Sequence, residues 1–142
     1  MSFLLDTCVV SELAKPTGEA RVKAWANSKN ELDFYISALT LGELQKGAAR
    51  LAEGAKKSLL LAWLHDDLIK RFADRVLPIN QAVALRWGEM QAQLEKQGKL
   101  MPAIDGLIAA TALQHQLTVV TRNTKDMEAS GVALFNPWST QK

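Results

Sequence analysis

Three acids and one amide stand where apolar runs give way to helical patterns, and their oxygen atoms could bind a metal ion. Asp6 ends the run FLLD, Glu43 lies six residues after the run FYIS, Asp105 stands early in an apolar helical segment, and Asn123 follows the run TVVT. Carboxylate and amide oxygens are the ligands that Mg²⁺ and Mn²⁺ prefer. If the fold brings these residues together, they predict a divalent-cation site.

Local helix-start effects offer a competing interpretation for each acid. Thr40 and Glu43 have the spacing of a capping box, and taken alone this explains Glu43 better than a metal site does. Asp6 could likewise cap the helix that follows it, and an acid in a first turn, such as Asp105, favours the helix dipole. Capping does not explain why Asp105 stands beside Gly106 in the otherwise apolar segment MPAIDGLIAATAL, where burial normally excludes charge.

The elements that must position these residues alternate along the chain. Short apolar runs typical of buried strands are 3–6, 34–37, 76–79, 118–121 and 132–135. The clearest helical patterns lie at about 41–53, 56–72, 81–97 and 103–115. This alternation predicts an α/β fold, a three-layer domain with a central, mostly parallel sheet of four to five strands flanked by helices. Ligands of such sheets bind beyond the carboxyl ends of the strands, where all four residues are expected.

Length and composition favour one domain spanning residues 1–142. Apolar residues make up 48% of the 142 residues and charged residues 23%, as in ordinary globular proteins. No apolar run approaches the roughly 18 residues of a membrane span, and no signal peptide is recognisable, so we expect no membrane contact. Cys8 is the single cysteine, which favours the reducing cytoplasm.

Net charge gives little guidance, but two surface features do. The formal charge of +2 is too small to indicate nucleic-acid binding by itself, although basic residues including Lys46 and Arg50 cluster between residues 46 and 57. The segment LLLAWL (59–64) is apolar around its whole helix, so it is either central in the core or covered by another chain.

Four motifs taken together resemble the PIN-domain ribonucleases, specifically the VapC-type toxins of bacterial toxin–antitoxin pairs. They are LLDTCVVSE, SALTLGEL, AIDGLIAATAL and TVVTRNTKDM, and they are followed by FNPW near the end of the chain. The resemblance implies a PIN-like fold in which Asp6, Glu43 and Asp105 hold Mg²⁺ or Mn²⁺. It also implies cleavage of RNA, commonly tRNA or rRNA, restraint by a cognate antitoxin, and a homodimer formed through the 41–72 hairpin.

These assignments give each residue an expected role in phosphodiester hydrolysis. A carboxylate-held cation lowers the pKa of its bound water and neutralises phosphate oxygens. We expect Asp6 and Asp105 to be the main ligands, Glu43 to be a ligand or a water-orienting base, and Asn123 to contribute from outside. Thr7 and Thr121 would position the acids or contact an RNA phosphate. Lys46 and Arg50 would hold the RNA backbone, which sets position more than sequence.

Two positions depart from the family pattern. Cys8 stands where Asn is common, and Asn123 stands where many members carry an acid, with Asp126 three residues later. Asn123 brings no negative charge, so a second ion is in doubt, and for Asp126 a surface role is favoured over substitution in the site. The alternative function is therefore a catalytically weakened module that binds RNA or antitoxin.

Other enzyme classes fit less well. An aspartyl-phosphate phosphatase would need an acid in place of Cys8, and that cysteine fits a small buried hydrophobe better than a nucleophile. Two distant histidines, His65 and His115, do not have the ligand spacing of a zinc site.

Overall fold

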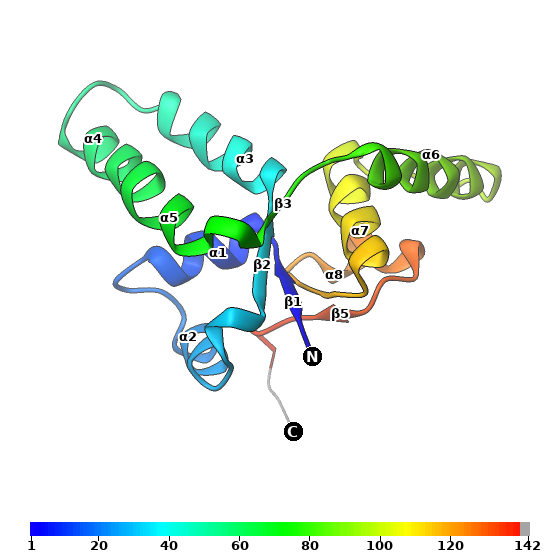
Figure 1. Cartoon of the computed structure of the whole chain (residues 1–142), viewed down its shortest axis with the longest axis horizontal. Helices are drawn as coiled ribbons and strands as arrows, with labels where there is room; N and C mark the ends of the chain where they lie inside the picture. The colour runs from blue at the N-terminus through cyan, green and yellow to red at the C-terminus, as the bar shows by residue number, and fades with distance from the viewer. Residues whose placement is uncertain (140–142) are drawn as a thin grey trace.

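Five short strands form one parallel sheet at the centre of the molecule (Figure 1). The computed structural model describes residues 1–139. The strands are β1 (Phe3–Leu5), β2 (Phe34–Ser37), β3 (Val76–Leu77), β4 (Thr118–Val120) and β5 (Leu134–Phe135). Their order in the sheet is β3-β2-β1-β4-β5, and each neighbouring pair is parallel. The predicted α/β architecture is confirmed, and all five strands lie within the predicted runs.

The helices occupy the segments between the strands. They are α1 (Thr7–Ala14), α2 (Ala20–Asn27), α3 (Ala38–Ala49), α4 (Ala55–Ala62), α5 (Ile69–Phe72), α6 (Gln81–Lys96), α7 (Ala103–His115) and α8 (Thr124–Met127). Three-residue 3₁₀ turns cover Glu31–Asp33, Ala73–Arg75 and Glu128–Ser130.

Most of the predicted helices are confirmed, with two differences. The helix predicted at 41–53 begins earlier, at Ala38, because Ser37 caps it at the end of β2, and it ends earlier, at Ala49. The predicted helix 56–72 is continuous but contains a π-helical segment, Trp63–Leu68, between α4 and α5. The predicted helices 81–97 and 103–115 are confirmed within one residue at each end.

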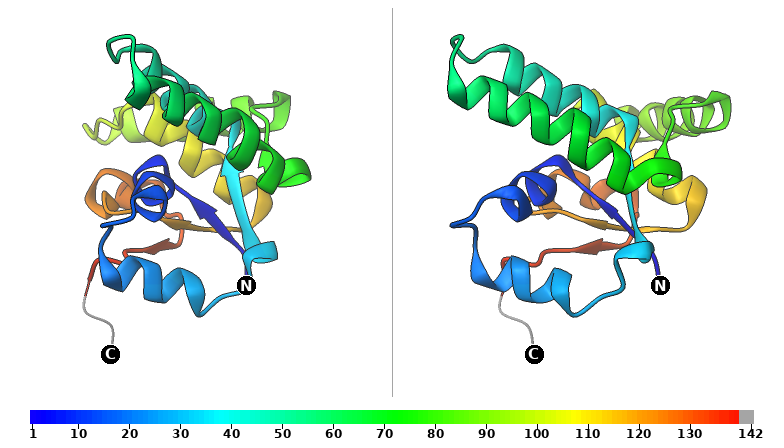
Figure 2. Two further views of the ribbon diagram at one scale, coloured as in Figure 1. Left: turned by 90° about the vertical axis from the view of Figure 1, so that its left-hand side faces the viewer. Right: turned by 60° about the vertical axis from the view of Figure 1, so that its left-hand side comes forward.

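Two apolar clusters, one on each face, hold the helices to the sheet. Phe3 and Leu5 of β1 face a cluster with residues from α1, α2, α3 and the α4–α5 segment. Leu4, between them, faces the opposite cluster, where Ile108 and Ala112 of α7 pack. Side chains alternate along a strand, so an apolar run such as FLL is buried on both faces. Figure 1 shows α1 and α7 on opposite sides of the strands, and the turned views in Figure 2 look from the α1 side, with α1 in front and α7 behind.

Strand register brings the functional residues to one edge. Phe3 pairs with Phe34 on one side and with Thr118 on the other, so β1, β2 and β4 end at the same level. The Asp6 amide continues the ladder by donating to the Val120 carbonyl at 2.9 Å. Polar residues are buried at or directly beyond these strand ends, namely Asp6, Ser37 and Thr121. The carboxyl edge of the sheet is therefore polar, whereas the strands are apolar.

The LLLAWL segment is not central in the core. Leu59 is 71% exposed, and within the segment only Leu64 is buried. Of the two expectations for this helix, coverage by another chain is the one that fits the described surface. Within residues 1–139, no helix has the length and apolar character needed to cross a membrane.

Candidate functional site

Asp6 is held in a fixed orientation at the end of β1. One oxygen, Oδ1, accepts the Thr7 amide at 2.9 Å, and the other, Oδ2, accepts the hydroxyl of Thr121 at 2.7 Å. The residue is only 5% exposed. Asp6 is the N-cap of α1, so the capping interpretation is correct for it. The cap uses only Oδ1, and the contact with Thr121 across 115 residues needs a different explanation.

Glu43 is not part of a capping box. Helix α3 begins at Ala38, and Ser37 is its N-cap, with the side-chain hydroxyl accepting the Leu39 amide at 3.0 Å. Thr40 therefore lies inside the helix, and the preferred local interpretation of Glu43 is wrong. Its Oε1 instead accepts the Thr7 hydroxyl at 2.6 Å, and that hydroxyl is 3.1 Å from the hydroxyl of Thr40. Thr7, the residue that follows Asp6, thus connects the start of α1 to Glu43 of α3.

Asp105 lies in the first turn of α7, and its surroundings disfavour its negative charge. Desolvation raises the pKa of this carboxyl, and the negative charges of Asp6, Asp126 and Glu43 raise it further, in that order of effect. No Lys or Arg contributes to the shift. Nearby negative charges raise the pKa of a carboxyl. The N-cap of α1 and the helices α3, α7 and α8 therefore bring four carboxylates into the same region, namely those of Asp6, Glu43, Asp105 and Asp126.

Two residues near the end of β4, Asn123 and Asp126, are candidates for the fourth position of the site, and the structure places both on the surface. Asn123 is exposed, and its backbone amide donates to the Thr121 hydroxyl at 3.0 Å. Asp126, in α8, is also exposed, yet its charge acts on Asp105 more strongly than that of Glu43. The sequence favoured a surface role for Asp126. Asp126 is a surface residue, but its negative charge also raises the pKa of Asp105. This effect depends on the packing of α8 beside α7, which the sequence does not show.

The oxygen atoms of this region suit a hard divalent cation. Burial and mutual repulsion leave negative charge uncompensated, which a bound Mg²⁺ or Mn²⁺ would neutralise. Among residues 1–139, no three His, Cys, Asp or Glu side chains are already arranged so that they could hold an ion. Asp6 and Glu43 instead accept hydrogen bonds from the hydroxyl groups of Thr121 and Thr7. Ion binding would then require side-chain rotation.

Cys8 faces the same region but is not poised as a nucleophile. Its thiol lies 3.7 Å from Oδ2 of Asp6. Burial and the Asp6 charge raise the pKa of the thiol, which keeps it neutral, whereas a reactive cysteine needs a lowered pKa. The residue is half-buried and packs against the core, as the sequence predicted.

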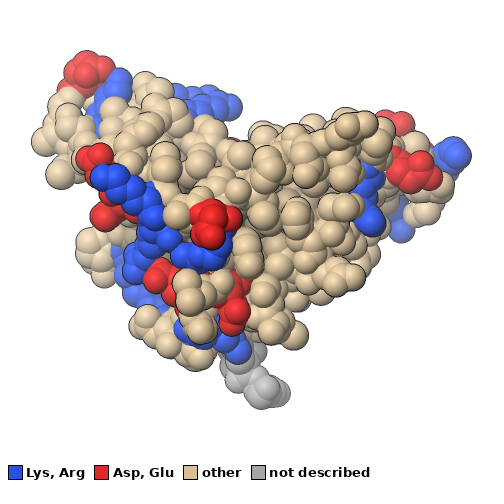
Figure 3. Space-filling model, viewed as in Figure 1, with Lys and Arg blue, Asp and Glu red and all other residues tan. Residues whose placement is uncertain are grey.

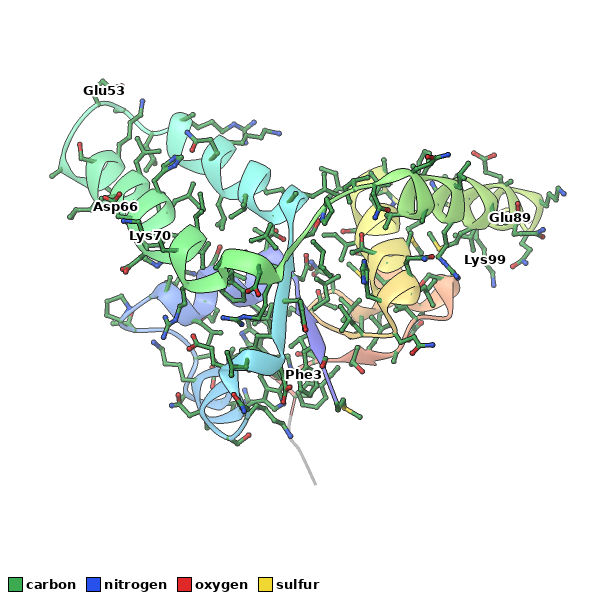
Figure 4. All side chains as sticks on the ribbon, viewed as in Figure 1. Phe3, Glu53, Asp66, Lys70, Glu89 and Lys99 are labelled. Atoms are coloured by element: carbon green, nitrogen blue, oxygen red, sulfur yellow. The ribbon has the colours of Figure 1, made fainter. Side chains whose placement is uncertain are left out.

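The two predicted RNA-contacting cations share one side of α3 with Glu43. Lys46 and Arg50 follow Glu43 by three and seven residues, a spacing that places them on the same helix face, and both are exposed. In the space-filling view, the outline of the molecule is notched between the α3–α4 side and the α6 side (Figure 3). The all-side-chain view shows α3 and α7 on opposite sides of the same gap between the ribbons (Figure 4).

Comparison with known proteins gives consistent matches along the chain. The PIN domain model matches residues 3–129. Toxin FitB of Neisseria gonorrhoeae is 44% identical over 136 residues, covering 96% of this chain and 98% of that protein. The tRNA(fMet)-specific endonuclease VapC of Shigella flexneri is 32% identical over 143 residues, covering 98% of this chain and 99% of that protein.

Solved structures agree with the sequence matches. The structure of FitAB bound to an IR36 DNA fragment contains a chain that superposes with a TM-score of 0.93 at 41% identity, covering 99% of this chain and 98% of that one. DNA-bound VapBC from Salmonella typhimurium gives a TM-score of 0.79 at 28% identity, with 96% and 98% of the two chains covered.

Proposed function

Because this chain belongs to the PIN-domain family, as a toxin of the VapC and FitB type from a toxin–antitoxin system, we propose that it is a metal-dependent endoribonuclease. Its acidic site would hydrolyse RNA phosphodiester bonds. The observation that carries the proposal is geometric: strand register and the Thr121–Asp6 and Thr7–Glu43 hydrogen bonds bring Asp6 and Glu43 to one edge of the sheet. Asp105 lies in the first turn of α7, and the charges of Asp6 and Glu43, together with desolvation, raise the pKa of its carboxyl. Structural ion pairs alone would not leave such a charge unbalanced.

Asp6, Asp105 and Glu43 would hold Mg²⁺ or Mn²⁺. When bound, the ion lowers the pKa of a coordinated water and neutralises charge on the phosphate. Thr121 donates to one oxygen of Asp6, and Thr7 donates to one oxygen of Glu43, so these hydroxyl groups would limit how far either carboxylate moves when the ion binds. Glu43 either ligates the ion or accepts the proton of the attacking water.

The remaining polar residues have supporting roles in this proposal. Thr7 and Thr121 act on the acids through the hydrogen bonds described above, and RNA contact by their hydroxyls is a further proposal. Asn123 supplies a neutral oxygen outside the ligand set, and Asp126 supplies the fourth negative charge near Asp105. Lys46 and Arg50 would hold the RNA backbone along the exposed face of α3.

RNA sequencing after brief expression tests the activity and identifies the target together. Ends of cellular RNA would be sequenced with the intact chain and with Asp105→Asn. Because one relative is a tRNA(fMet)-specific endonuclease, tRNA is the first class to inspect, and rRNA is the second. New 5′ ends that depend on Asp105 support the proposal. Identical RNA ends in both cultures, with both proteins present and folded, would overturn it.

The second candidate is a module that binds RNA or antitoxin without cleaving. Asn123, a neutral residue after β4, favours this candidate, whereas the charge of Asp126 near Asp105 favours the enzyme. Incubating the purified chain with labelled tRNA in Mn²⁺ separates the two functions. Retained RNA or antitoxin binding without cleavage would select the binding module.

An antitoxin partner follows from membership of a toxin–antitoxin system, and a homodimer is our further proposal. The support is the apolar surface of the α3–α4 hairpin, where Leu59 is 71% exposed. Light scattering of the intact chain and of Leu59→Lys tests the dimer. We expect a dimer for the first and a larger monomer fraction for the second.

A further inference from the structure

Within the described residues 1–139, the side chain of Asp105 makes no hydrogen bond. Asp6 and Glu43 each accept a hydroxyl hydrogen bond, whereas no hydrogen bond contributes to the pKa shift of Asp105. Helix α7 also starts without a side-chain cap, because Pro102 occupies the N-cap position. The position of Asp105 therefore depends on whatever holds the first turn of α7 in place.

Helix α6 makes the contacts that hold this turn. The side-chain amide of Gln91 donates from Nε2 to the Met101 carbonyl at 3.2 Å, just before α7 begins. A Cβ atom added at Gly106 would lie only 2.9 Å from Nε1 of Trp87, so the indole edge rests directly on the helix backbone. The two α6 residues thus contact the chain on both sides of Asp105.

Trp87 and Gln91 also bring polar atoms into this interface that packing alone does not require. Nε1 of Trp87 and Oε1 of Gln91 are buried and have no hydrogen-bond partner within the described part of the chain. Both lie near Gly106, at 2.9 and 3.4 Å from the same added Cβ position. They are four residues apart on α6 and so share one face. Buried polar groups are normally paired, and an apolar pair would fill this space at lower cost.

We propose that Trp87 and Gln91 are positioning residues that hold the first turn of α7, and with it Asp105, close to the other carboxylates. This inference rests on the proposed metal site. The Gln91–Met101 hydrogen bond and the contact of Trp87 with Gly106 restrict movement of the turn that carries Asp105. Loosening them lets the turn move away and weakens metal binding before it weakens the fold.

Calorimetric titration of the full chain with Mn²⁺ tests the proposal with a readout other than nuclease activity. The variants are Trp87→Phe, which keeps an aromatic ring but removes the indole N–H, and Gln91→Leu, which removes the side-chain amide. Gln93→Leu is the matched control, because Gln93 is exposed on the same helix. We expect the Kd for Mn²⁺ to rise by about tenfold in each test variant, as for other residues that orient metal ligands. Gln93→Leu should leave it unchanged.

Melting temperatures separate positioning from simple structural support. If both test variants melt lower but bind Mn²⁺ as the intact chain does, the residues only stabilise the fold and the inference is overturned. Should Gln91→Leu fail to fold, the conservative Trp87→Phe decides by the same criterion. Asp105→Asn is measured in parallel. If the intact chain binds Mn²⁺ no better than Asp105→Asn, the proposed function fails and this inference fails with it.

Discussion

The hydroxyl of Thr121 donates a 2.7 Å hydrogen bond to Oδ2 of Asp6, although 115 residues separate the two in the chain. The pair exists because β1 and β4 are neighbours in parallel register, with Leu5 opposite Val120. The residue after each strand therefore meets the other at the sheet edge. This contact fixes the buried carboxylate around which the proposed site is built.

Removing that hydrogen bond should cost stability. We predict that Thr121→Val lowers the free energy of unfolding by about 1.5–3 kcal/mol, because the Asp6 carboxylate then has no hydroxyl donor on Oδ2. Urea denaturation at neutral pH measures the change. Thr118→Val, a half-buried position in the same strand, is the control and should change stability much less. Equal losses at both positions would mean that the hydroxyl of Thr121 contributes nothing beyond its packing.

Replacing Asp105 should separate activity from stability. We predict that Asp105→Asn lowers RNA cleavage by roughly 100-fold or more, since it removes a proposed metal ligand rather than a group that orients one. Without metal, the variant should be as stable as the intact chain or more so, because like-charge repulsion is relieved. Initial cleavage rates and thermal melting measure these two effects. Glu89 is exposed on α6 (Figure 4), so Glu89→Gln should change neither the cleavage rate nor the melting temperature.

The metal-free protein should lose part of its stability as pH rises. The pKa of Asp105 is raised in the fold above its ordinary value of 3.8, so the folded state holds the proton more tightly than the unfolded state. The protonated form contributes stability below that ordinary value, and this contribution is lost as pH rises through the raised pKa. Urea titrations in the presence of a chelator compare the intact chain with Asp105→Asn. The difference in the free energy of unfolding should grow in favour of the variant as pH rises from the ordinary pKa of Asp105 to its raised pKa. A constant difference would contradict the assigned shift.

RNA binding should depend on the cations of α3. We predict that Lys46→Ala and Arg50→Ala each weaken binding and make its salt dependence shallower, by about 0.7 in the log–log slope for each phosphate of single-stranded RNA that is no longer neutralised. Binding is measured in the Asp105→Asn background, so that cleavage does not interfere. Lys99→Ala is the control, because Lys99 lies in the loop that follows α6, away from α3 (Figure 4). If neither Lys46→Ala nor Arg50→Ala changes the slope of the salt dependence, the RNA binds to another surface.

Replacement of a glycine by alanine should have opposite effects on stability at two positions, Gly18 and Gly88. A Cβ at Gly18 would lie 2.3 Å from the Glu12 carbonyl oxygen, so Gly18→Ala forces backbone movement and should cost about 1–3 kcal/mol. Gly88, inside α6, has nothing within 4 Å of its added Cβ. Gly88→Ala should therefore stabilise the protein by up to about 1 kcal/mol through helix propensity. Denaturant midpoints compare the two, and stabilisation by Gly18→Ala would contradict the described turn.

Much of the fold could be predicted from the sequence because its signals are local. Runs such as FLLD and TVVT are apolar on both faces and end in polar residues, which predicts central parallel strands and their limits. The segment QAVALRWGEMQAQLEK shows its helix through a continuous pattern that its single glycine, Gly88, does not interrupt. The residue types at the strand ends, carboxylates and an amide, similarly indicated metal chemistry before any contact was known.

Contacts between distant elements were decided only by the tertiary structure. Local spacing favoured a Thr40–Glu43 capping box, but α3 starts earlier, and Glu43 accepts a hydrogen bond from Thr7 instead. Asp126 gave no local sign that its charge acts on Asp105. Such pairings depend on strand order and helix packing, which sum many weak long-range interactions that no short window of sequence contains. The chain's own residues therefore determined which chemistry was available, and the packed fold decided which of them could share it.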